Sequence, residues 1–263
     1  MALLVSLETG TSSHKDGRQG PRSYCRGFTL VELAVVVAVI ALLLGSLLVP
    51  LTTQVEQRNV AQTDKQLEEI RQALIGFAMV NGRLPRPANS ATDGTEKALA
   101  CATELDCTGY LPWAALGVNR TDAWGKLFRY SVSREFANAN FTLSTTAANP
   151  KVIVTRDSGG AQVPLTSTTI NPTVIAVVMS YGSNNFGTTD DGTPIANLST
   201  TNVDEQNNNA EFSSCGWVAN CTTFWGRPVA TNTAATGGEF DDRVVWISWS
   251  VLSNRMVSAG KLP

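Results

Sequence analysis

The hydrophobic pattern near the start of the chain is one unbroken apolar run. It extends from Phe28 to Leu51, holds 24 residues and carries a single charged side chain, Glu32. A helix rises about 1.5 Å per residue, so such a run crosses a hydrocarbon core about 30 Å thick with some tilt. It is too long for the apolar part of an ordinary signal peptide, and no small-residue cleavage site follows it. The sequence therefore predicts a transmembrane helix segment over 28–51.

A helical pattern continues beyond this run, over 52–82. Its apolar positions recur at steps of three and four, at Leu67, Ile70, Leu74 and Phe77. Charged residues occupy the other face, as is typical of an amphipathic helix that packs one stripe on a globular domain. Asn81-Gly82 suits the end of the helix, and Pro50 is expected to kink it. One long helix is favoured, and a membrane anchor followed by a separate helix is the alternative.

The remaining residues, 83–263, alternate short apolar strands with polar stretches and are expected to form a globular, β-rich head. Strand candidates are Phe141–Ser144, Lys151–Thr155, Val174–Ser180 and Val244–Val251. The last has a clear two-residue period. Long polar stretches at 181–211 and 226–242 are interpreted as loops. The predicted fold class is α+β, with an antiparallel sheet packed on the helix.

The residues just before the apolar run give it an orientation. Arg22 and Arg26 precede it. The positive-inside rule then places the N-terminus in the cytoplasm and the head on the far side of the membrane. That side permits disulfides.

Residues 26–32 read Arg-Gly-Phe-Thr-Leu-Val-Glu and lead directly into the apolar run. This stretch resembles the prepilin peptidase recognition motif of type IV pilins and of type II secretion pseudopilins. The resemblance implies a cleaved leader at 1–27, cleavage between Gly27 and Phe28, N-methylation of Phe28, and a glutamate, Glu32, at the fifth mature position. A glycine before the scissile bond also lets the backbone extend into a protease cleft.

Glu32 is the residue of the apolar run whose burial in a membrane costs the most free energy. A carboxylate inside a membrane-spanning helix costs roughly 2–3 kcal/mol or more, so a function is expected for it. One interpretation is that Glu32 pairs with the freed α-amine of Phe28 in a neighbouring subunit and fixes the axial register of a filament. The alternative is a side chain that reaches the membrane interface near the helix end.

A second stretch, Asp122–Tyr130, looks like the D-x-W-G-x-x-(Y/F)-x-Y stretch of pseudopilins. There a turn precedes the first strand of the sheet, and Trp124 is expected to anchor the loop in the core. The resemblance implies a pilin-like lollipop, in which a long N-terminal helix carries a C-terminal antiparallel sheet.

The function implied by this resemblance is that of a pseudopilin of a type II secretion system. The chain would be a single-pass protein of the bacterial inner membrane with a periplasmic head, assembled into a filament that drives protein secretion. Its partners would be prepilin peptidase, other pilin-like subunits and the inner-membrane assembly platform. The alternative is a minor pilin of a type IV pilus, with a role in adhesion, motility or DNA uptake.

Four of the five cysteines form two pairs with the same spacing. The pairs are Cys101 with Cys107, and Cys215 with Cys221. Three connectivities are possible, and bonding within each pair is favoured. The rival is a zinc site of four thiolates, which usually has tighter spacing and suits a reducing compartment.

Histidine content and charge exclude several functions. The only histidine, His14, lies in the expected leader, so the rest of the chain lacks the residue for a Ser-His-Asp, Cys-His or His-ligated metal site. The net charge is −2, and the leader carries four basic and two acidic side chains, so its removal leaves about −4. A mildly acidic chain has no basic stripe for nucleic acid. We expect no enzymatic activity and no nucleic-acid partner.

Acidic residues within the long polar stretch suggest one cofactor. The candidate ligands are Asp190, Asp191, Asp204 and Glu205. Calcium takes six to eight oxygen ligands, and loops of this kind supply them. Major pseudopilins have a calcium-binding C-terminal loop, but no EF-hand spacing is present here, and a solvated polar loop is the favoured reading. Asp241 and Asp242 are either further ligands or the polar entry to a strand.

Three aromatic residues flank the second cysteine pair. They are Trp217, Phe224 and Trp225. A local core around a disulfide is favoured over a partner surface, although aromatic residues do dominate binding hot spots.

Overall fold

The structure is a computed structural model that describes residues 28–168, 173–215 and 220–262, with the backbone alone for 45–51. The chain divides after Thr52 into two compact units. The expected leader, 1–27, and Trp217 lie outside the described residues.

The first helix, α1, extends from Leu30 to Asn81. Its helical backbone continues through Pro50. Gly82 follows with a φ of +71° and donates its N–H to the Ala78 carbonyl at 2.8 Å, which closes the helix as the Asn81-Gly82 pair predicts. A side chain at residue 82 would meet Asn140, whose Cγ lies 2.9 Å from the added Cβ position, so the turn needs glycine.

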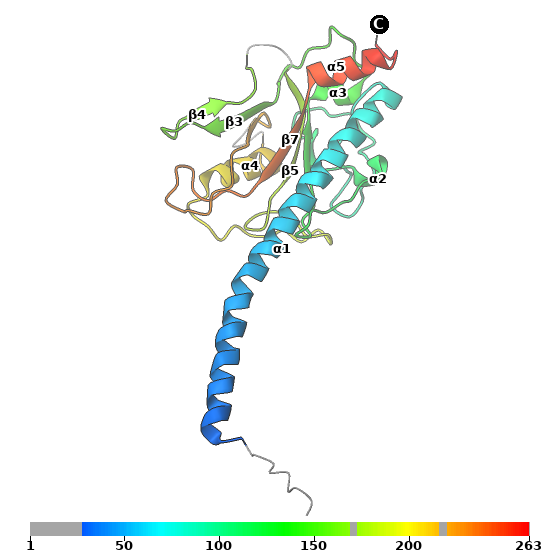
Figure 1. The fold of residues 1–263 in the computed structure, drawn as a ribbon. Coiled ribbons are helices and arrows are strands. Elements are labelled where there is room, and N and C mark those ends of the chain that lie inside the picture. Colours follow the sequence, from blue (N-terminus) through cyan, green and yellow to red (C-terminus); the bar gives the residue numbers. More distant parts are fainter. Residues whose placement is uncertain (1–27, 169–172, 216–219, 263) are drawn as a thin grey trace, which may run out of the picture. The chain divides into compact units, whose positions relative to one another are not determined.

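Within the second unit, residues 53–81 of α1 lie across a four-stranded sheet (Figure 1). The predicted stripe is buried at Leu67, Ile70 and Leu74, but Phe77 is only half-buried and Ala78 takes its place in the core.

The four-stranded sheet is antiparallel throughout and has the strand order β1-β2-β5-β7. Its strands are β1 (Thr108–Tyr110), β2 (Arg129–Val132), β5 (Val174–Ser180) and β7 (Arg243–Ser248). All seven residues of β5 are buried, because α1 covers one face of the sheet and a second layer covers the other. This sheet on a helix confirms the α+β class.

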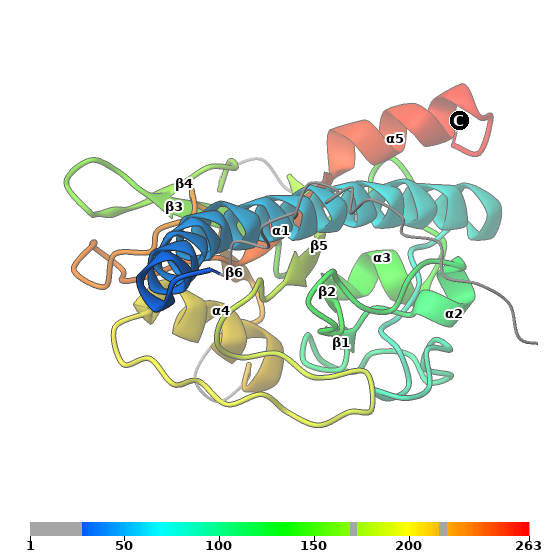
Figure 2. The ribbon, with the colours of Figure 1, turned by 60° about the horizontal axis from the view of Figure 1, so that its bottom comes forward.

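The second layer contains a small sheet with the order β4-β3-β6. Its strands are β3 (Val152–Arg156), β4 (Gln162–Pro164) and β6 (Thr223–Trp225). The β3 and β6 strands are parallel, which the sequence did not indicate. Helix α4 (Val203–Ser213) lies beside β6 (Figures 1 and 2).

Three short helices complete the head. They are α2 (Trp113–Leu116), α3 (Arg134–Asn138) and α5 (Trp249–Ser258). In both views α5 lies beside the last turns of α1, and its buried residues Leu252 and Met256 join the same core (Figure 2).

Two strand predictions were wrong. Residues 141–144 form no strand, because Phe141 instead packs its ring on Phe136 and Trp249 at centroid distances of 5.3 and 5.5 Å. The last predicted strand ends at Ser248 and α5 begins at Trp249, because Trp249, Leu252 and Met256 also satisfy a helical spacing.

Candidate functional site

The N-terminal part of α1 presents a single acidic group on an apolar surface. Every side chain from 28 to 44 is exposed, including Phe28 at 77%. The Thr29 hydroxyl accepts the Glu32 N–H at 3.2 Å, and the Thr29 carbonyl accepts the Leu33 N–H at 3.1 Å. Thr29 therefore caps the helix, and Glu32 lies in its first turn, where the helix dipole favours a negative charge.

No helix among the described residues combines the length and the apolar character that crossing a membrane requires. The transmembrane segment predicted at 28–51 stays a prediction.

Residues 22–48 match the family model for the prokaryotic N-terminal methylation motif. The chain carries this methylation motif. It is the cleavage and methylation signature of type IV pilin-like prepilins, and its presence confirms the resemblance seen in the sequence. Gly27 lies outside the described residues, whereas Phe28 and Glu32 stand at the exposed start of α1. No curated protein and no solved structure matched the chain.

Beyond the methylation motif, the head joins its cysteines within each pair. Disulfides connect Cys101 with Cys107 and Cys215 with Cys221. This is the connectivity favoured by the sequence, and it leaves none of these four thiolates for zinc.

The aromatic residues near the second disulfide belong to the core. Phe224 is fully buried and Trp225 is 4% exposed. The Phe224 ring packs on Phe212 at 4.9 Å, and the Arg156 guanidinium lies 4.7 Å from the centre of the Trp225 ring. These residues make a local core rather than a partner surface.

The Asp122–Tyr130 stretch forms the predicted turn before β2. The buried Asp122 carboxylate accepts the N–H groups of Trp124 and Lys126 at 3.0 and 2.9 Å and the Ser180 hydroxyl at 2.6 Å. Gly125 has a φ of +80°, which the turn requires. Trp124 does not anchor the core as predicted, because it is half-buried and donates its indole N–H to Glu56 at 3.2 Å.

Three of the four predicted calcium ligands, Asp190, Asp191 and Asp204, are each bound to other partners in the protein. Asp190 is exposed and pairs with Arg120 at 2.7 Å. Asp191 is also exposed and accepts bonds from Thr189 and Thr193 within its own turn.

Asp204 is fully buried between two arginines. Its carboxylate meets Arg156 Nη2 at 2.5 Å and Arg227 Nε at 2.8 Å. Two positive charges already neutralise this carboxylate, so its role in the fold is structural.

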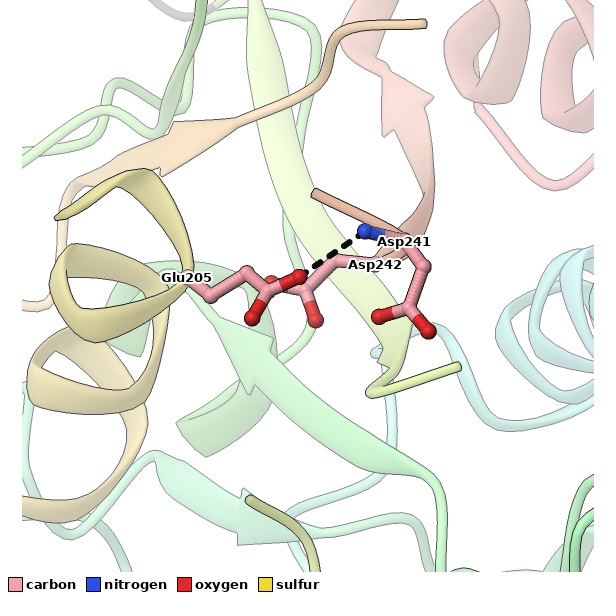
Figure 3. Close-up of side chains that lie close together, drawn as sticks. All are labelled: Glu205, Asp241 and Asp242. Atoms are coloured by element: carbon pink, nitrogen blue, oxygen red, sulfur yellow. Dashed lines mark hydrogen bonds between the residues drawn. The ribbon is translucent and has the colours of Figure 1, made fainter. Parts of the chain in front are cut away.

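The fourth residue, Glu205, meets the two acids at the entry to β7 (Figure 3). Glu205, Asp241 and Asp242 each place one carboxylate oxygen within 4.8 Å of the others. The Asp241 N–H donates to Glu205 Oε1 at 2.9 Å, and Asn202 donates to Glu205 Oε2 at 2.7 Å. Among the described residues this is the only group of three or more Asp, Glu, Cys or His side chains that has such geometry.

Burial dominates the electrostatics of this acidic cluster. It raises the pKa of Glu205 to about 7 and the pKa of Asp242 well above its usual range, and each neighbouring negative charge adds to the effect. Asn208 stabilises the Asp242 carboxylate by one bond of 2.8 Å.

Lys126, which sequence reasoning did not single out, is the cation of this region. It is 4% exposed, and its ammonium donates to the backbone carbonyls of Asn184 and Asn185. Burial lowers the pKa of Lys126, whereas the charges of nearby carboxylates, Asp241 foremost, oppose that change. The Lys126 ammonium thus lies among oxygen atoms of the kind that coordinate a metal ion. Its position in the Asp-x-Trp-Gly-Lys turn was the only sequence signal.

Proposed function

We propose that this protein is a pilin-like structural subunit, a pseudopilin of a type II secretion system. Prepilin peptidase removes residues 1–27 and methylates the new N-terminus at Phe28. The observation that carries the proposal is the match of residues 22–48 to the methylation motif. The protein is the substrate of that chemistry and catalyses none of its own.

Assembly in this proposal depends on the apolar start of α1. Its exposed side chains offer a surface that lipid or neighbouring helices cover, and Glu32 is the one acid between Phe28 and Leu51. The methylated amine of Phe28 in one subunit pairs with Glu32 of the next, which offsets the cost of burying the carboxylate and fixes the register of the filament. Other pilin-like subunits and the inner-membrane assembly platform are the partners.

The proposed location is the bacterial inner membrane, with residues 28–51 in the bilayer and the head in the periplasm. Basic residues Arg22 and Arg26 precede the apolar run, which supports a cytoplasmic N-terminus. The two disulfides of the head support an oxidising compartment.

The test is deletion of the gene, followed by measurement of exoprotein release and of twitching in the same strain. Loss of exoprotein release with normal twitching supports the secretion role. Loss of twitching with normal release identifies a minor pilin of a type IV pilus instead. Intact-mass spectrometry of the native protein checks the processing step, because a chain that still begins before Phe28 in cells with active peptidase contradicts both roles.

A further inference from the structure

Arg129, on β2, is a buried cation without an acidic partner. Its side chain is 9% exposed, and among the described residues no carboxylate lies within salt-bridge distance of it. One of its N–H groups, at Nη2, donates to the Phe212 carbonyl at 2.6 Å. The Nε atom is buried without a hydrogen-bond partner. Buried guanidinium groups are normally paired, so this one lacks its complement.

Aromatic rings compensate part of the charge but supply no anion. The guanidinium carbon lies 4.5 Å from the centre of the Tyr110 ring and 5.7 Å from that of Phe212. A second cation, Lys97, lies nearby. Burial is the main cause that lowers the pKa of Lys97, and the positive charge of Arg129 lowers it further. Arg129 and Lys97 are therefore neighbouring cations.

Arg129 lines a cavity of about 360 Å³. Its wall combines apolar residues, among them Tyr181, Phe186 and Ile195, with the polar residues Asn197 and Asn209. This combination of apolar walls with a few converging polar groups is typical of a small-molecule site.

Two details show that specific contacts hold the wall of this cavity in place. Phe186 has a φ of +46°, which is rare for a bulky aromatic residue, and this conformation brings its ring 6.1 Å from that of Tyr181. The Tyr181 hydroxyl donates to Asn209 Oδ1 at 3.0 Å, which fixes the amide so that its NH₂ group remains a donor.

We propose that this cavity binds a small organic carboxylate. The carboxylate meets the positive charge of the Arg129 guanidinium, and the apolar body of the ligand packs on Phe186 and Ile195. The inference concerns the head alone and does not depend on the role of the chain in a filament.

The experiment is calorimetric titration of the full chain in a non-ionic detergent, with benzoate as the probe and benzamide as its neutral counterpart of similar shape. We expect benzoate to bind at least about tenfold more tightly, because its charged oxygen accepts a stronger hydrogen bond from the guanidinium than the neutral amide oxygen does. Equal binding of the two probes, or binding of neither, overturns the proposal.

Two variants locate the site. Arg129→Met is expected to abolish the preference for benzoate over benzamide. Because this change also alters the core, Ala196→Trp places a ring at the exposed mouth of the cavity and is expected to weaken benzoate binding at least about tenfold. Leu198→Trp is the matched control, since Leu198 lies on the same loop, is 91% exposed and does not line this cavity. Unchanged binding in Ala196→Trp contradicts the assignment.

Discussion

The buried ammonium of Lys151 donates to the carboxylate of Glu104 at 2.8 Å. The same ammonium donates to the Cys221 carbonyl at 2.6 Å. Glu104 lies in the loop closed by the first disulfide, and Cys221 belongs to the second, so one lysine fastens both disulfide-closed segments to the start of β3. Its side chain is fully buried, which makes this ion pair a fixed part of the head.

Lys151→Met is expected to destabilise the oxidised protein by roughly 3 kcal/mol or more, because it leaves the Glu104 carboxylate and the Cys221 carbonyl without their donor. Denaturant unfolding measures the change. Lys65→Met is the matched control, since the Lys65 side chain is 79% exposed and its pair with Glu69 contributes about 0.5 kcal/mol or less. Equal, small effects of the two changes contradict the assigned role.

The acidic cluster predicts an unusual pH dependence of stability. Glu205 has a pKa of about 7 in the folded protein, against an ordinary value of 4.5. The folded state therefore holds the proton more tightly than the unfolded chain does. This contribution is complete below about pH 4.5 and is lost as the pH rises through about 7.

Glu205→Gln is expected to reduce the loss of unfolding free energy between pH 4.5 and pH 7, whereas Asp242, whose pKa burial also raises, continues to contribute to it. The control is Asp191→Asn. The pKa of Asp191 is lowered by the Thr189 hydroxyl, so its contribution is lost only at lower pH, outside this window. An unchanged pH profile in Glu205→Gln argues against the burial of a neutral Glu205.

Calcium is expected to leave the melting temperature of the wild-type protein unchanged. The Lys126 ammonium already lies among the carbonyls of Asn184 and Asn185 and near Asp241, so a divalent ion meets a positive charge in the same region. Thermal unfolding with calcium and with a chelator measures this. A calcium-dependent rise would support a metal site at Glu205, Asp241 and Asp242.

Glu32→Ala is expected to yield a chain that is cleaved normally but is not incorporated into filaments, because the variant lacks the acid that pairs with the Phe28 amine. Intact-mass spectrometry reports cleavage, and sheared filament fractions report incorporation. Glu69→Ala, which removes an exposed acid further along α1, should assemble normally. Filaments of Glu32→Ala at wild-type levels would refute the pairing.

Local pattern was sufficient for several elements of this protein. The three- and four-residue spacing of Leu67, Ile70 and Leu74 identified the face of α1 that packs on the sheet, and the continuous apolar run of Val174–Ser180 identified β5. Helix α4 was not predicted from the sequence, because its buried face is polar. Asp204, Glu205 and Asn208 face the interior, so hydrophobic periodicity gives no signal there.

The sequence by itself determined the methylation motif, the packing stripe of α1 and the apolar run of β5, because each depends on residues that are neighbours along the chain. Only the tertiary structure decided which charges meet. Glu205 and Asp241 are 36 residues apart, Lys151 and Cys221 are 70 apart, and Arg129 reaches Phe212 across 83. Such contacts follow from how strands and helices pack, since the energy of a buried charge depends on partners that only the fold brings close.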